Sequence, residues 1–213
     1  MLIITKDYSQ EDIHNLTFNK YQYLIKRVFD YIASFILLVI TFPLWFIVKY
    51  KISKESPGKL LFFQTRVGIN GKLFECIKFR SMSENQEYTK NLYTQDDDPR
   101  IFPFGKFMRL TRIDELPQLI NVIKGDMHII GPRAELDVLV NGYRKQIKNY
   151  SIRNNIMPGI TGLAQVRYPY GENLLDTKRK LVYDIFYIQN WSIKLEFKII
   201  LETISVIFGA KGK

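Results

Sequence analysis

The sequence predicts a mainly helical α+β fold that is attached to a membrane through a helix near its N-terminus. Three observations support this prediction. Residues 31–48 form an uncharged apolar run, residues 61–82 contain an Asn-Gly pair between two β-prone runs, and several later segments carry apolar residues at helical spacing. With 213 residues, of which 46% are hydrophobic, the chain has room for one domain with an ample core.

The chain is strongly basic, with 31 Lys and Arg residues against 21 Asp and Glu residues and a net charge of +10. Such a balance indicates polyanionic partners: nucleic acid, an anionic membrane surface or phosphorylated substrates. Nucleic acid is the least favoured, because no basic run interleaved with aromatic residues forms a recognisable binding module. The single cysteine, Cys76, excludes an internal disulfide and lies in an apolar run, where we expect it to be a core residue.

The apolar run is at the lower length limit for a helix that spans a membrane. Basic residues precede and follow it: Lys20, Lys26, Arg27, Lys49, Lys51 and Lys54. Because basic residues prefer the cytoplasmic side, a simple span would place positive charge on both faces. Pro43 should also break or kink the helix. A re-entrant helix, which turns near Phe42 and Pro43 and leaves by the face it entered, accounts for both features; a kinked span and a buried core helix are the alternatives.

A β-hairpin is expected over residues 61–82, because Asn70-Gly71 is the preferred pair for a type I′ turn. Four basic side chains project from this unit: Arg66, Lys72, Lys78 and Arg80. They form either a solvated basic face or a phosphate-binding face.

Residues 111–125 are expected to form one short helix. Asp114 suits the N-cap, Pro117 falls in the first turn where a missing N–H costs little, and Gly125 suits the residue after the helix end. The whole chain is organised around this segment, because it carries the most distinctive group of charged residues.

In this segment the adjacent carboxylates Asp114 and Glu115 stand at the expected helix start, with Arg109 and Arg112 just before them. A helix N-terminus has partial positive charge and free N–H groups, which suit a phosphate. Carboxylates, arginines and a helix start together are the parts of a metal-dependent phosphoryl-transfer site. The alternative is a capped helix whose acidic residues favour the helix dipole.

Further helices are expected over residues 137–149, 173–190 and 192–208. The last helix has an apolar face that either packs on the domain or lies in the membrane interface: Ile193, Phe197, Ile200, Ile204 and Phe208. Before these helices, a Gly-Pro-Arg turn presents Arg133, whose guanidinium suits two-point contact with phosphate.

Asp184 falls on the apolar stripe of the helix expected over residues 173–190. A carboxylate among core positions is costly unless it is paired or bound to a metal. Asp184 is therefore a candidate site residue, and a structural pair with an arginine is the alternative.

The order of these motifs resembles the bacterial sugar transferases, the monotopic phosphoglycosyl transferases in their compact catalytic form. The matching motifs are Lys26-Arg27-Val28-Phe29-Asp30, Ser56-Pro57-Gly58, Phe63-Gln64-Thr65-Arg66-Val67-Gly68, Lys78-Phe79-Arg80-Ser81-Met82, Asp98-Pro99-Arg100, Asp114-Glu115-Leu116-Pro117-Gln118, Gly131-Pro132-Arg133, Pro158-Gly159-Ile160-Thr161-Gly162 and Tyr183-Asp184 before Trp191. The resemblance runs in order from about residue 20 to the C-terminal helix. Ala134, Leu163 and Phe102 depart from the family's usual residues, which bears on substrate details and not on the reaction.

The resemblance implies a leading segment (1–19), a re-entrant membrane helix (20–55) and a catalytic domain (56–213) on the cytoplasmic face of the cell membrane, with amphipathic interfacial helices around the active site. It implies a reaction in which a UDP-sugar and polyprenyl phosphate give polyprenyl-diphosphate-sugar and UMP. Membrane lipids are further partners, nucleic acid is not, and a homodimer is left open.

In this family the aspartate of the Asp-Glu pair is the nucleophile, which implies that Asp114 forms a covalent phosphosugar intermediate. The glutamate belongs to the Mg²⁺ site, which implies Glu115 together with Asp114 as metal ligands. The other expected site residues are Lys78, Arg80, Arg112 and Arg133 for phosphate binding and Asp184 in the catalytic cluster. Cationic charge near a carboxylate nucleophile agrees with these roles, because it screens the repulsion of an incoming diphosphate.

A non-catalytic, membrane-anchored basic scaffold or anionic-lipid-binding protein is the rival interpretation.

Overall fold

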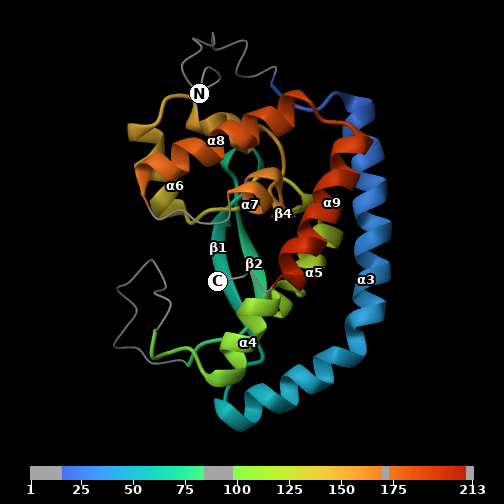
Figure 1. The fold of residues 1–213 in the computed structure, drawn as a ribbon, viewed down its shortest axis with the longest axis vertical. Helices are drawn as coiled ribbons and strands as arrows, with labels where there is room; N and C mark the ends of the chain where they lie inside the picture. Colours follow the sequence, from blue (N-terminus) through green and yellow to red (C-terminus); the bar gives the residue numbers. More distant parts are fainter. Residues whose placement is uncertain (1–15, 84–97, 169–172, 210–213) are drawn as a thin grey trace.

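The computed structural model describes residues 16–83, 98–168 and 173–209, which form a long bent helix against a domain of shorter helices and two small sheets (Figure 1). This architecture confirms the mainly helical α+β class. Most of the expected leading segment lies outside the described residues. Phe18, near its end, is buried in the core of the domain.

Helix α3 (Lys20–Glu55) begins with a capping box. The Asn19 side chain accepts a hydrogen bond from the Gln22 backbone, and the Gln22 side chain accepts one from the Asn19 backbone. Pro43 lies inside α3, and Figure 1 shows this helix as two limbs joined by a sharp bend. Because proline is a usual cause of such bends, the structure agrees with the kinked helix expected from the sequence.

Helix α3 is long and apolar enough to cross a membrane, with a mean hydropathy of 2.4 over an 18-residue window of which 11% is buried. Its surface carries many exposed apolar side chains, among them Phe35, Ile36, Val39, Ile40 and Phe46. The core helix of a soluble protein would bury most of such a surface. The exposure therefore disfavours the buried-helix alternative and is consistent with membrane association.

Strands β1 (Leu61–Val67) and β2 (Leu73–Phe79) form the predicted antiparallel hairpin. The turn residues Asn70 (φ 53°) and Gly71 (φ 78°) both have positive φ, as a type I′ turn requires. Cys76 on β2 is buried with a free thiol, as expected.

The prediction of a single helix over residues 111–125 is wrong. Helix α4 (Pro103–Thr111) ends at Arg112, a 3₁₀ turn η3 follows (Ile113–Glu115), and helix α5 (Gln118–Lys124) begins after Pro117. Pro117 has no N–H with which to continue an α-helix across this point. Asp114 therefore lies inside a tight turn and does not cap a helix, whereas Gly125 ends α5 with φ 92°, as predicted.

The remaining elements are β3 (His128–Ile130), α6 (Asp137–Gln146), η4 (Tyr150–Asn155), β4 (Gly159–Thr161), α7 (Leu163–Arg167), α8 (Leu174–Gln189) and α9 (Ile193–Phe208). The expected helices over residues 173–190 and 192–208 are confirmed. The helix expected over residues 137–149 ends earlier, because Ile147 has an extended backbone. Strands β3 and β4 pair in parallel, which has no counterpart among the predictions.

Two hydrophobic clusters hold the elements together. The larger joins α6, η4, α8 and α9, with Ile130, Tyr150 and Ile185 among its members. The smaller packs the second limb of α3 against β2 and α4 through Val48, Ile52, Phe79 and Met108. The membrane helix and the domain therefore share a core, which fixes their relative orientation.

Helix α9 lies beside the first limb of α3 (Figure 1). Its residue Ile199 is buried, and Ile200 packs partly against the larger cluster. Three members of the predicted apolar face are exposed: Ile193, Phe197 and Ile204. Most of that face thus does not pack on the domain. This favours the alternative in which the apolar face of α9 lies in the membrane interface.

We predict that Gly159→Ala destabilises the protein. A Cβ at Gly159 would lie 2.0 Å from the backbone nitrogen of Gly131, the residue after β3, and 2.5 Å from the backbone oxygen of Thr161 in β4. Overpacking against backbone costs about 1–3 kcal/mol or more, which thermal unfolding in detergent would measure as a lower midpoint. Gly142→Ala on α6 is the control, because a Cβ there meets nothing within 4 Å; an equal loss in both variants would contradict the prediction.

Candidate active site

Asp114 and Glu115 lie in a cleft of about 220 Å³, and both are only 7% exposed. The cleft is lined by Lys78, Arg109, Arg112, Asp114, Glu115, Arg133, Gln165 and Lys180. The structure therefore brings together the two expected carboxylates and three of the four expected phosphate-binding residues. The exception is Arg80.

Helix α5 is held against the hairpin by one buried side chain, which brings Glu115 close to strand β2. The Ile77 backbone donates a hydrogen bond to Asn121 Oδ1 at 3.0 Å, and Asn121 Nδ2 donates one to the Glu75 carbonyl at 2.7 Å. This clamp places the turn before α5 beside Lys78, which donates to Glu115 Oε1 at 2.8 Å.

Glu115 is surrounded by cations. Its Oε1 lies 2.8 Å from Lys78 Nζ, 3.7 Å from an Arg133 nitrogen and 3.9 Å from an Arg112 nitrogen. Burial by itself would raise the pKa of this carboxyl, but the charges of Lys78, Arg133 and Arg112 together hold it below the usual range. Glu115 is therefore ionised at neutral pH and is a fixed negative charge among the cations.

Asp114 has a different environment, although it is the next residue. Burial raises the pKa of its carboxyl to about 6, and the charge of Glu115 adds to this rise against the opposing effect of Lys78. Its buried Oδ1 has no hydrogen-bond partner among the described residues. An ionised carboxylate with an uncommitted oxygen is what a nucleophile or a metal ligand requires.

Arg112 reaches the cleft from an unusual backbone conformation, the left-handed region with φ 60°. For a residue with a Cβ this conformation costs on the order of 1 kcal/mol. It ends α4 and turns the chain into η3, so that Arg112 and the two carboxylates face the same cleft.

Sequence reasoning missed Gln165 on α7. Its Oε1 accepts a hydrogen bond from Arg133 at 3.3 Å, and its buried Nε2 has no partner within the described part of the chain. The signal for it was its place just after the glycine-punctuated loop over residues 157–163. Lys180, on α8, was missed as well because nothing local distinguishes it from a solvated lysine.

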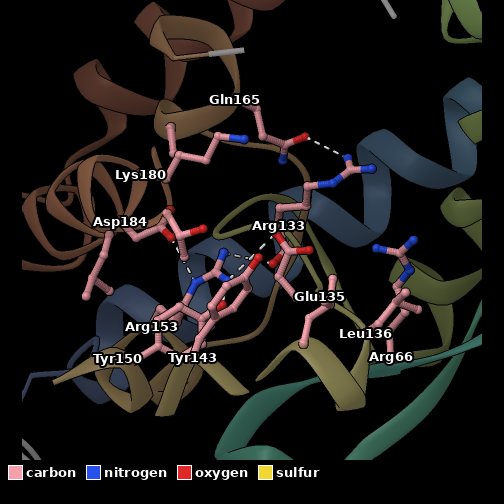
Figure 2. Close-up of a pocket in the computed structure, with 14 residues that line it drawn as sticks. Arg66, Arg133, Glu135, Leu136, Tyr143, Tyr150, Arg153, Gln165, Lys180 and Asp184 are labelled. Carbon is pink, nitrogen blue, oxygen red and sulfur yellow. Dashed lines mark hydrogen bonds and ion pairs between the residues drawn. The ribbon is translucent and has the colours of Figure 1, made fainter. Parts of the chain in front are cut away.

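Asp184 lines a neighbouring pocket of about 210 Å³ (Figure 2), which shares Arg133, Gln165 and Lys180 with the cleft. Its Oδ2 accepts a hydrogen bond from Arg153 Nε at 2.9 Å. Burial raises the pKa of Asp184 to about 6 in spite of this arginine. The geometry matches the alternative, a buried carboxylate paired with an arginine, and Asp184 does not line the cleft of Asp114 and Glu115.

Arg80 lies elsewhere, at the end of α3. Its guanidinium donates to the Ser56 hydroxyl at 2.6 Å, to the Ser56 carbonyl and to the Lys59 carbonyl at 2.7 Å. The side chain is buried and its donors are used in joining α3 to the hairpin. This geometry gives no support to the phosphate-binding role expected of Arg80.

The residues present fit a metal ion that arrives with its phosphate. Mg²⁺ is commonly bound through one or two carboxylates, with substrate phosphates and water completing its shell. Asp114 has an uncommitted oxygen and Glu115 is adjacent, whereas no group of three or more His, Cys, Asp and Glu residues that could hold a metal occurs among residues 16–83, 98–168 and 173–209. A preformed metal cage is thus absent from these residues.

The cleft combines two buried carboxylates with five cationic side chains, in a protein with a long, largely exposed apolar helix that is consistent with membrane association. Residues 21–210 match the bacterial sugar transferase family. The chain belongs to this family.

Characterised relatives include the UDP-N-acetylgalactosamine-undecaprenyl-phosphate N-acetylgalactosaminephosphotransferase of Aeromonas hydrophila, which is 42% identical over 88% of this chain and 45% of its own length. The UDP-glucose:undecaprenyl-phosphate glucose-1-phosphate transferase of Caulobacter vibrioides is 39% identical over 85% of this chain and 68% of its own length. The transferase of the same name from Escherichia coli K12 is 36% identical over 85% of this chain and 39% of its own length. The chain thus spans less than half the length of two of these relatives.

We predict that Asp114→Asn stabilises the folded protein in metal-free buffer. The folded pKa of about 6 lies above the ordinary aspartate value of 3.8, so ionisation of Asp114 lowers the stability of the fold, fully above about pH 6 and not at all well below pH 3.8. The gain, on the order of 1–3 kcal/mol, should grow between about pH 4 and pH 6 and level off above that in thermal unfolding.

Asp98→Asn is the control for this measurement. The hydrogen bond from Arg100 lowers the pKa of Asp98, so its neutralisation should bring no gain at pH 7.5. A gain from Asp114→Asn that is independent of pH would contradict the explanation.

Proposed function

We propose that this chain transfers a sugar-1-phosphate from a UDP-sugar to a polyprenyl phosphate of the undecaprenyl type, releasing UMP, as the first membrane step of polysaccharide or glycan synthesis. The observation that carries the proposal is Asp114, an uncommitted buried carboxylate beside Glu115 in a cleft lined by cations. The names of the relatives support the substrates, because each contains undecaprenyl phosphate and a sugar-phosphate transfer.

In the proposed first step, a carboxylate oxygen of Asp114 attacks the β-phosphorus of the UDP-sugar. A bond forms between this oxygen and phosphorus as the bond from phosphorus to the bridging oxygen breaks, and UMP leaves with the electron pair. In the second step, a phosphate oxygen of the lipid attacks the same phosphorus and Asp114 leaves as the free carboxylate. A pKa of about 6 supports this role, because Asp114 is ionised at neutral pH yet more basic than an exposed aspartate.

The cations around Glu115 support the binding of a diphosphate. Lys78, Arg112 and Arg133 each lie within 4 Å of its Oε1 and present positive charge to the cleft. They would screen the repulsion between Asp114 and the phosphates and stabilise the charge that develops on the departing UMP. Asp114 and Glu115 are the residues that would hold Mg²⁺, which when bound neutralises charge on the diphosphate.

The pocket of Figure 2 is suited to the nucleotide part of the donor. It adjoins the cleft through Arg133, Gln165 and Lys180, and Figure 2 shows Gln165 and Arg133 pointing toward each other, joined by a hydrogen bond. The tyrosines Tyr143 and Tyr150 line its far side and offer surface for a base.

The test is UMP release by the purified protein with Mg²⁺, undecaprenyl phosphate and a panel of UDP-sugars. We expect release that requires lipid and Mg²⁺ and that falls at least about a thousandfold in Asp114→Asn, because covalent catalysis is lost. Asp137→Asn on α6 is the matched control, since this carboxylate lies outside the cleft and should leave release unchanged. A variant Asp114→Asn that binds membranes and retains full release would exclude the mechanism, and inactivity of the folded wild-type chain across all nucleotide sugars would favour the scaffold interpretation.

We further propose that α3 is re-entrant and that the catalytic domain lies on the cytoplasmic face. The support is an exposed apolar helix that bends and has basic residues near both ends, including Lys20, Lys49 and Lys54 (Figure 1). The exposed apolar residues of α9 support a domain that rests on the same surface.

For the topology we predict that a tag before Lys20 and a tag after Lys213 are labelled from the same side of sealed vesicles. A re-entrant helix returns the chain to the face it left, whereas a simple span separates the two tags. Labelling from opposite sides would refute the re-entrant helix, and vesicles opened with detergent provide the control for access.

A further inference from the structure

A second cavity also adjoins the cleft. Its lining is mostly apolar, whereas the lining of the pocket of Figure 2 is mostly polar. This second cavity has a volume of about 220 Å³ and is lined by Leu37, Arg112, Glu115, Leu116, Leu119, Ile129, Ile160, Thr161, Gln165, Val166, Thr203, Val206 and Ile207. We call it the lipid groove. Three of these residues, Arg112, Glu115 and Gln165, also line the cleft, so the two cavities join.

The lining of the lipid groove changes from charged to apolar along its length. Apart from Arg112 and Glu115 at the junction, its lining residues carry no charge. The hydroxyl groups of Thr161 and Thr203 are hydrogen-bonded within the protein: their oxygens lie 2.9 Å apart, and Thr203 also donates to the Ile199 carbonyl. The groove therefore offers hydrocarbon contact with a cationic group at one end.

The lipid groove reaches the surface where the protein is most apolar. Leu37 on α3 and Ile207 on α9 line the groove and are also exposed, at 42% and 36%. Around them lie further exposed apolar side chains of the same two helices, Ile36 and Ile204. A molecule could thus pass from a membrane into the cleft without leaving apolar surroundings.

We infer that the lipid groove holds the hydrocarbon chain of the polyprenyl phosphate next to its phosphate, and that Arg112 receives this phosphate at the cleft. This inference rests on the proposed function. The match is one of charge and polarity: an anionic head meets Arg112 while the chain follows the apolar lining.

The arrangement also explains how the two substrates share one site. Both displacements at phosphorus occur in line, so the lipid phosphate must take the place that the UMP phosphate has left. The nucleoside then leaves through the pocket of Figure 2, which shares Arg133 and Lys180 with the cleft, while the lipid chain occupies the groove, which contains neither.

The test compares Val206→Trp, which fills the lipid groove, with Leu201→Trp, which adds the same bulk on the exposed face of α9, at 53% exposure. Two steps are measured separately: the burst of UMP with UDP-sugar and no lipid, and steady-state KM for undecaprenyl phosphate, for geranyl phosphate and for the UDP-sugar. We expect Val206→Trp to keep the burst, to raise KM about tenfold or more for both lipid acceptors, because geranyl phosphate has the same chain next to its phosphate, and to leave KM for the UDP-sugar unchanged. Leu201→Trp should match the wild type.

A second pair of variants lies on the opposite wall: Leu37→Trp in the lipid groove and Ile36→Trp beside it, at exposed positions of α3. If Val206→Trp loses the burst, the inference is tested with this second pair of variants instead. An unchanged KM for undecaprenyl phosphate in Leu37→Trp, or an equal rise in the KM for the UDP-sugar, would overturn the inference. Absence of the burst in the wild type would instead count against the proposed function.

Discussion

The adjacent buried carboxylates Asp114 and Glu115 are the constraint on which the site depends. Two neighbouring negative charges at 7% exposure are costly, and the structure offsets only one of them fully. Glu115 has an ion pair with Lys78 and two arginines nearby, whereas Asp114 keeps an oxygen without a partner. The difference moves their pKa values in opposite directions, up for Asp114 and down for Glu115, which is the basis for proposing Asp114 as the nucleophile.

The membrane helix is joined to this site by polar contacts as well as by a shared core. Arg27 on α3 donates to the carbonyls of Val122 and Ile123 at the end of α5, the helix that follows the two carboxylates. The preceding residue, the buried Lys26, pairs with Glu196 on α9 at 2.8 Å. Such buried pairs contribute more to a defined orientation than to net stability. The orientation of α3 and the position of the cleft are thereby linked.

Local sequence signals were reliable where one short segment decides its own conformation. The turn at Asn70-Gly71 and the helix end at Gly125 follow from positive φ, which these residues tolerate. The segment around Asp114 was misread because Pro117 was assigned to the first turn of one helix, whereas it separates a 3₁₀ turn from α5. The contacts of Arg80 could not be predicted for a different reason: its partners Ser56 and Lys59 are brought to it only by the packing of α3 on the hairpin.

The sequence by itself determined the chain's family, its membrane helix, its hairpin and the two carboxylates, because these depend on composition, spacing and local turn chemistry. The tertiary structure decided which charges meet. Lys78 and Glu115 are 37 residues apart, Arg153 and Asp184 are 31 apart, and Lys26 and Glu196 are 170 apart. No local propensity encodes such pairs, since they form only when helices and strands pack around a common core.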